Sequence, residues 1–209
     1  MYLPVYNCLM NNNNTNSRDT ILHCALRLFG ERGYESVGIT EITQQAGVTK
    51  PTLYYFFQSK EGVFKAILEG YYTRFNQLLQ KVCFYKPHTE DYNEDIFLVL
   101  ERVVNTYFSF AREYDIFYLM LLALSFAPPD RDTTILTKPY IHTQYETVTN
   151  LFREIGSNHH NVKGKELECA CHFIAMINAN IGFWYQGIGE LDEEKAKRIV
   201  HQFMHGIFA

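Results

Sequence analysis

The sequence of 209 residues lacks an apolar run long enough to cross a membrane. Its longest such run, residues 116–127, has 12 residues, whereas a spanning helix needs about 20. No basic segment followed by an apolar one opens the chain, so a secretory signal is not indicated. The five cysteines follow no regular spacing, which favours reduced thiols. Together, these absences predict a cytoplasmic protein with no membrane partner.

An excess of positive charge is also missing. The chain has 19 Lys and Arg against 23 Asp and Glu, a formal net charge of −4, whereas DNA-binding domains usually carry a basic surface. The charge is unevenly spread, however: residues 1–60 carry five basic and four acidic side chains, and residues 61–209 carry 14 and 19. The acidity belongs mainly to the second part. The total charge therefore predicts modest non-specific affinity for DNA but does not exclude DNA binding.

Apolar side chains recur with the period of an α-helix from residue 17 onward, and no segment alternates apolar and polar residues as a strand does. We therefore expect an all-α fold of about nine helices. The clearest periodicity begins at Ser59, and Lys86-Pro87 is expected to close that helix. A nearly all-apolar segment after Asp115 predicts a buried helix. Another helix is expected over residues 137–155, ended by Gly156.

Two short predicted helices, residues 39–46 and a second one capped by Thr49, are joined by a turn at Gly47. This is a helix-turn-helix arrangement, whose second helix can enter a major groove. Leu53 and Phe56 are expected to anchor that second helix inward. Hydroxyl and amine groups can contact phosphates and base edges. The predicted DNA-binding residues are Thr40, Thr49, Lys50, Pro51, Thr52, Tyr54, Tyr55 and Lys60.

Lys60 is placed in that set because it stands at the start of a helix, where a phosphate can bind. The alternative interpretation of the whole segment is three packed helices with a solvated polar face. More than the general pattern is present, however. The run GVTKPTLYYFFQSKEGVF, residues 47–64, resembles the signature of the TetR family of transcriptional regulators. Its matching positions, in family order, are Thr52-Leu53-Tyr54, Phe56-Phe57, Ser59-Lys60-Glu61 and Phe64.

The preceding segment, ALRLFGERGYESVGITEITQQAG, resembles the first two helices of the same family. The chain departs from the family pattern at Gly38, Thr43 and Pro51, where Ser or Thr, Ala and Gly are common. Pro51 alters the surface that would face the groove. We assign residues 17–62 to a helix-turn-helix DNA-binding domain and residues 63–209 to a helical regulatory and dimerisation domain. Residues 1–16, with four consecutive Asn, are expected to be a disordered or mis-annotated extension.

The resemblance implies a homodimer that reads a palindromic operator and is released by a small-molecule effector, most often as a repressor. It implies dimerisation through helices near residues 166–187 and 192–208. Apolar side chains on more than one side of the first of these helices agree with a partner-facing surface. They are Phe173, Met176, Ile177, Ala179 and Phe183. An activator, a regulator without a small effector, and an all-α ligand-binding or scaffold protein without operator binding remain alternatives.

Family members commonly carry an effector pocket among the fourth to eighth helices. Aromatic residues are about as dense in both parts of the chain, so their number alone does not locate such a pocket. The amide of Asn178 interrupts an apolar helix face and needs a hydrogen-bond partner, either a ligand or another helix across the dimer. The candidate effector-binding residues are Phe108, Tyr114, Tyr118, Asn178 and Trp184.

Catalytic and metal-binding patterns are missing from the sequence. His201 and His205 stand one helical turn apart, but no third ligand follows at a spacing typical of zinc sites. No Gly-rich phosphate loop, nucleophile elbow or zinc-protease motif occurs. We therefore expect no enzymatic activity, no metal and no cofactor.

Overall fold

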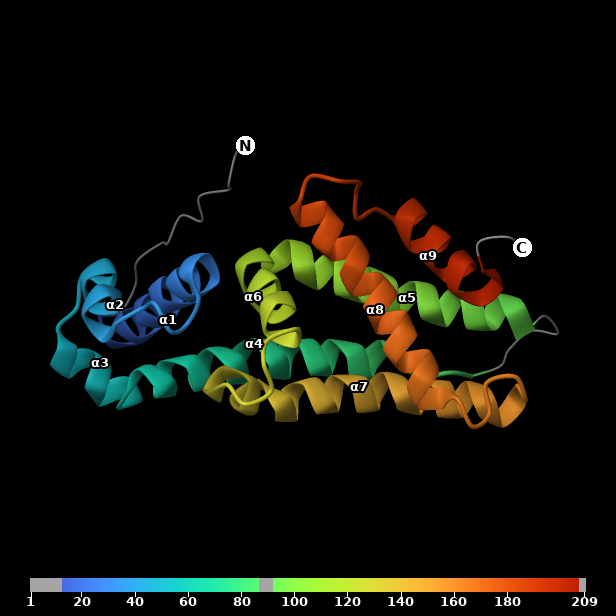
Figure 1. Ribbon diagram of the computed structural model, residues 1–209, viewed down its shortest axis with the longest axis horizontal. Helices are drawn as coiled ribbons and strands as arrows, with labels where there is room; N and C mark the ends of the chain where they lie inside the picture. The colour runs from blue at the N-terminus through green and yellow to red at the C-terminus, as the bar shows by residue number, and fades with distance from the viewer. Residues whose placement is uncertain (1–12, 87–91, 207–209) are drawn as a thin grey trace. The chain divides into compact units, whose positions relative to one another are not determined.

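The computed structural model describes residues 13–86 and 92–206. The described residues form nine helices and no strand, which confirms the predicted all-α fold for this part of the chain (Figure 1). The helices are α1 (Asn13–Arg32), α2 (Ile39–Ala46), α3 (Lys50–Phe57), α4 (Lys60–Val82), α5 (Tyr92–Glu113), α6 (Asp115–Ser125), α7 (Asp132–Asn158), α8 (Glu166–Tyr185) and α9 (Glu193–His205). None of these helices combines the length and apolar character that a membrane span needs.

The chain divides into two compact units within α4, between Ile67 and Leu68. The sequence-based boundary was placed between residues 62 and 63. In the first unit, α1, α2, α3 and the start of α4 pack around a small apolar core. Its fully buried side chains include Ile21, Phe29, Ile42, Leu53 and Phe64.

The second unit contains the rest of α4 together with α5 to α9. Within this unit α8 packs on α7, and α9 packs on α5 (Figure 1). Its centre is dense with aromatic rings: the Phe75 ring stacks on Phe110 at a centroid distance of 4.4 Å and meets Tyr107 edge-on at 4.9 Å. Aromatic pairs in these geometries add to the free energy of apolar burial. The second unit is therefore built around a closely packed aromatic core.

Several helix ends differ from the predictions. Helix α1 begins at Asn13, inside the predicted extension, because no Gly or Pro separates residues 13–16 from the helix that follows. Residues 1–12 lie outside the described part. Helix α4 ends at Val82, before the expected end at Lys86. The chain leaves the helix there, and the backbone N–H of Tyr85 donates to the carboxylate of Glu154 on α7 at 2.9 Å.

Helix α7 runs through Gly156, which was expected to end it. A glycine lowers helix propensity but does not by itself stop a helix that tertiary packing supports. At this position the helix packs close to the α7–α8 loop: a Cβ on Gly156 would lie 3.5 Å from the Lys163 backbone nitrogen.

Helix α6 was expected to be a buried helix because its side chains are apolar nearly all round, but only one side of it is buried. Phe117, Tyr118 and Leu121 are buried, but Leu119 is 42% exposed. Phe126, just past the end of the helix, is 89% exposed. The helix has one buried side only, because its neighbours α5, α7 and α8 do not surround it.

Candidate nucleic-acid interface

Helix α3 begins at a side-chain cap. The Thr49 hydroxyl accepts a hydrogen bond from the backbone N–H of Thr52 at 3.4 Å and lies 2.9 Å from the Thr52 hydroxyl. Pro51 occupies the first turn, where its missing N–H leaves no bond unmade. The preceding turn is closed by Gly47 at φ 63°, a left-handed conformation that a glycine adopts without strain. The sequence thus specifies both the turn and the start of the helix.

Two side chains one turn apart hold α3 on the first unit. Leu53 and Phe57 are buried, whereas Phe56 is only partly covered. The prediction that Phe56 anchors the helix was therefore wrong, because Phe57 shares the face of Leu53 and Phe56 lies at its edge.

The opposite face of α3 is open to solvent. Lys50 and Pro51 are exposed, Tyr54 is 47% exposed and Tyr55 is 79% exposed. Residues four positions apart lie on the same side of a helix, one turn apart. Lys50 is therefore next to Tyr54, and Pro51 is next to Tyr55. Thr40 on α2 and the cap Thr49 are also exposed, and Thr52 is half-buried. Most of the predicted set is thus accessible in the first unit.

The basic side chains near this face are mostly occupied by neighbours. Arg27 donates to the Gln45 side chain, and Arg32 pairs with Glu41. Arg18 lies 3.6 Å from the Asp19 carboxylate. Among the described residues up to 60, Lys50 is the one basic side chain that makes no hydrogen bond, ion pair or ring contact.

The ammonium of Lys60 is also engaged. It donates to the backbone carbonyl of Tyr34 at 3.0 Å and lies 4.1 Å from the centroid of the Tyr34 ring. That ring packs in turn on Phe29 and Phe64. Lys60 therefore ties the α1–α2 connection to the start of α4, an arrangement that the sequence did not indicate.

Residues 21–67 match the family model described as "Bacterial regulatory proteins, tetR family". The matched residues cover α2 and α3, with their exposed face, and most of α1. Residues 21–67 therefore form a TetR-family N-terminal domain. The resemblance inferred from the sequence is confirmed.

Curated relatives agree over their N-terminal parts. The chain is 30% identical to the HTH-type transcriptional regulator YdgC of Bacillus subtilis over 95 residues, 45% of this chain and 49% of that protein. It is 41% identical to the HTH-type transcriptional repressor ComR of Escherichia coli over 58 residues, 28% of each chain. The matched region thus spans about half, or less, of the length of these relatives.

Solved structures resemble nearly the whole chain in fold. The fatty acid degradation regulator FadR of Bacillus halodurans aligns with a TM-score of 0.73 at 15% identity, over 95% of this chain and 99% of that one. FadR of Bacillus subtilis in complex with stearoyl-CoA aligns with a TM-score of 0.72 at 16% identity, over 90% and 98%. At these identities the likeness shows the TetR-like fold of both units.

The predicted effector residues occupy different settings in this TetR-like second unit. Phe108 and Tyr118 are fully buried, and the Tyr118 hydroxyl donates to the Asn178 side-chain carbonyl at 2.7 Å. The partner that Asn178 needs is thus supplied within the protomer. Tyr114 and Trp184 are half-buried; the Tyr114 hydroxyl donates to Glu113 at 2.5 Å, and the Trp184 ring packs on Tyr185.

A cavity of about 520 Å³ lies elsewhere in this unit, among α5, α7, α8 and α9. Its lining includes Ile96, Phe152, His159, Cys169 and Phe203, and none of the five predicted residues. No group of three or more His, Cys, Asp or Glu side chains in the described ranges is arranged to hold a metal ion. The rings of His201 and His205 lie 4.8 Å apart as a pair.

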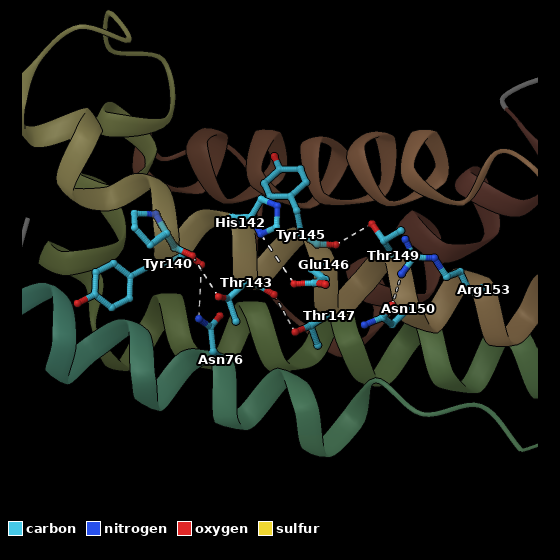
Figure 2. Close-up of polar contacts among 11 residues, drawn as sticks. Asn76, Tyr140, His142, Thr143, Tyr145, Glu146, Thr147, Thr149, Asn150 and Arg153 are labelled. Atoms are coloured by element: carbon cyan, nitrogen blue, oxygen red, sulfur yellow. Dashed lines mark hydrogen bonds and ion pairs between the residues drawn. The ribbon is translucent and has the colours of Figure 1, made fainter.

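The sequence analysis missed a polar group inside the core of the second unit. Tyr72 is fully buried and Asn76 is nearly so, one turn apart on α4. Asn76 donates to the Tyr140 backbone carbonyl on α7 at 3.5 Å, as Figure 2 shows. The sequence does indicate this polar group, because Asn76 interrupts the apolar series of Leu68, Phe75 and Leu79.

Proposed function

We propose that this chain is a sequence-specific DNA-binding transcriptional regulator, a repressor that leaves a palindromic operator when a small molecule binds its second unit. The observation that carries the proposal is the exposed face of α3 within the segment that matches the TetR family. The curated relatives include the repressor ComR and the activator FasR of Mycolicibacterium smegmatis, so the family match alone does not choose between repression and activation.

In this proposal α3 enters the major groove with Lys50, Pro51, Tyr54 and Tyr55 toward the DNA. Two phenols and one ammonium can donate hydrogen bonds to phosphates and base edges. Thr40 and Thr49 lie at the margin of the same face and can contact the backbone. The half-buried Thr52 supports the cap, and Lys60 positions the α1–α2 connection from behind.

A palindromic operator requires a two-fold symmetric protein. We place the dimer interface on α8 and α9, near residues 166–187 and 192–208. Ala175, Ala179 and Phe183 are exposed at steps of four residues, so they form one line along α8. Phe173 and Ile177, which were expected off the core-facing stripe, are instead buried within the protomer. Small side chains on such a line allow a partner helix to approach closely.

Release by an effector requires two arrangements of the protein that bind operator DNA differently. The effector must favour the arrangement whose recognition helices no longer match the groove spacing. We place the effector in the second unit, near Phe108, Tyr118 and Asn178, with Tyr114 and Trp184 at the periphery. Because operator DNA lies in the cytoplasm of bacteria, the proposal also places the protein there.

A gel-shift titration at low salt with duplex DNA that flanks the gene tests this function. We expect sequence-specific binding, and Tyr54→Ala should weaken it by about 1–3 kcal/mol if Tyr54 contacts the groove or its phosphates. Tyr54→Phe is the matched control, because it keeps the ring and removes only the hydroxyl. Absence of any sequence preference in the wild-type titration would refute the regulator and leave an all-α ligand-binding or scaffold protein.

A further inference from the structure

The interior of the second unit contains polar atoms that have no partner within the described residues. The Tyr72 hydroxyl and the Asn76 side-chain carbonyl are both buried and make no hydrogen bond. Leaving such groups unpaired away from water destabilises the folded state. Their neighbours are satisfied: Gln144 donates to the Tyr107 hydroxyl at 2.7 Å, and Tyr118 donates to Asn178 at 2.7 Å. A third buried side-chain oxygen, the Thr134 hydroxyl on α7, is also unpaired, whereas the Tyr107 and Tyr118 hydroxyls are paired.

No charged side chain is buried in the described part of the second unit. The buried polar side chains of the described residues are all Thr, Asn or Gln, and no Lys, Arg, His, Asp or Glu is among them. Burial raises the pKa of the Tyr72 phenol, so this hydroxyl stays protonated at neutral pH. An ionised ligand group placed here would find no buried opposite charge among the described residues, and burying an unpaired charge costs far more than burying a neutral polar group.

We propose that the effector is an uncharged, largely apolar molecule with a hydroxyl group, which binds between α4 and α7 and hydrogen-bonds to Tyr72 and Asn76. This inference rests on the proposed function, since it names the ligand class of the regulator. A hydroxyl fits because it donates one hydrogen bond, which the Asn76 carbonyl can accept, and accepts others, such as one from Tyr72. A carboxylate only accepts and cannot serve the Asn76 carbonyl.

Tyr140 on α7 controls access to this place. Its ring stacks on the Tyr72 ring at a centroid distance of 5.2 Å, and its half-buried hydroxyl donates to the exposed Glu69 carboxylate at 2.9 Å. Figure 2 shows the Tyr140 side chain on the α4 side of α7, beside Asn76. A ligand that stacks on Tyr72 must displace the Tyr140 ring. Ligand binding in this proposal separates the Tyr140 ring from the Tyr72 ring.

The proposed ligand class differs from that of one structural neighbour. FadR of Bacillus subtilis was solved with stearoyl-CoA, whose head group is anionic. Among the residues whose burial the structure describes, the buried polar side chains include no cation to compensate such a charge. The likeness to that protein is one of fold, at 16% identity, and does not transfer its ligand.

Thermal melting with matched pairs of probes tests the ligand class. The alcohols 1-octanol, 4-propylphenol and cyclohexylmethanol are compared with octanoate, 4-propylbenzoate and cyclohexanecarboxylate. A ligand that binds only the folded state raises the melting temperature. We expect at least one alcohol to raise the Tm of the wild-type protein, its paired carboxylate to have no such effect, and Asn76→Leu and Tyr72→Phe to lose the shift. Equal shifts with the carboxylates, unchanged shifts in the variants, or no shift with any alcohol would overturn the proposal.

The variants need a stability control that does not depend on ligand. Tyr72→Phe removes an unpaired hydroxyl, so the ligand-free Tm should be unchanged or higher. Tyr107→Phe is the matched control: it leaves the buried Gln144 amide without its acceptor, so its Tm should fall. A fall in both variants would show that the Tyr72 hydroxyl has a partner, such as a buried water, and would contradict its assignment to a ligand.

Operator binding is a separate readout. Tyr72 and Asn76 belong to the second unit and the exposed face of α3 belongs to the first, so both variants should still shift operator DNA in the absence of alcohol. Specific DNA binding combined with no response to alcohols overturns only the ligand class. Loss of specific DNA binding in the wild-type protein overturns the regulator itself.

Discussion

Lys50 carries an exposed positive charge with no ion pair in the first unit, whereas Arg27, Arg32 and Lys60 are each bonded to a neighbouring residue. Each phosphate that a protein neutralises contributes about 0.9 to the slope of log K against log salt. We expect Lys50→Ala to lower this slope by about 0.9 for each Lys50 that contacts DNA. A fluorescence-anisotropy titration of operator DNA over a range of salt concentrations measures it.

Lys60→Ala serves as the matched control for that measurement. It removes a cation that donates to the Tyr34 carbonyl, so it should lower the stability of the first unit and change the salt slope little. An equal loss of slope in both variants would show that the Lys60 ammonium leaves Tyr34 and contacts a phosphate. That outcome would support the role that the sequence alone suggested for Lys60.

Gln58 ends α3 in a conformation that suits glycine. Its φ is 65°, and it is the one described non-glycine residue with a positive φ. A residue with a Cβ atom destabilises the folded state by about 1–2 kcal/mol in this left-handed conformation. Gln58→Gly should therefore stabilise the protein by about 1 kcal/mol in urea unfolding, and Gln58→Asn by less. A lower unfolding midpoint for the glycine variant would contradict this account of the α3–α4 turn.

At the scale of elements, the start of α3 depends on its cap. Thr49→Ala removes the hydroxyl that accepts from Thr52, and losing such a cap costs about 1 kcal/mol. We expect lower stability and weaker operator binding together, because the cap holds the recognition helix and its first turn. Thr49→Ser keeps the oxygen and should preserve both properties. Chemical denaturation and gel shifts on the same preparations compare them, and a stable Thr49→Ala protein would argue against the cap.

The sequence predicted which segments are helices better than where they end. Local chemistry specified the Gly47 turn, the Thr49 cap and the Asp192 cap of α9, whose side chain accepts from the Lys195 N–H at 2.7 Å. Gly156 was misinterpreted because packing against the α7–α8 loop keeps that part of α7 helical. A helix of eight residues is too short for periodicity to show whether Phe56 or Phe57 lies on the same face as Leu53.

The candidate sites depended on contacts between residues far apart in the sequence. Lys60 meets Tyr34 across 26 positions, and Gln144 meets Tyr107 across 37. Tertiary packing determines such pairs, so a motif can place Lys60 at a helix start without showing that its ammonium is already engaged. The exposed face of α3 was predictable because an eight-residue helix with two inward anchors leaves its other side open.

At the scale of the whole molecule, operator binding should require the dimer. Ala179→Glu places a charge on the exposed line of Ala175, Ala179 and Phe183, where burial against a partner would leave it uncompensated. We expect this variant to be a folded monomer in light scattering and to lose specific operator binding. Asn150→Glu on the exposed side of α7 is the control and should remain dimeric. If the Ala179→Glu protein is still a dimer, the dimer interface does not include this face of α8.

The central claim is that the protein recognises a specific DNA sequence through α3, although its first 60 residues carry a net charge of only +1, from five basic and four acidic side chains. The most direct test is selection of binding sites from a random-sequence duplex library with the full chain. The account predicts enrichment of one palindromic motif, and loss of that enrichment with Tyr54→Ala. Recovery of no motif, or of the same motif with and without the Tyr54 side chain, would contradict it.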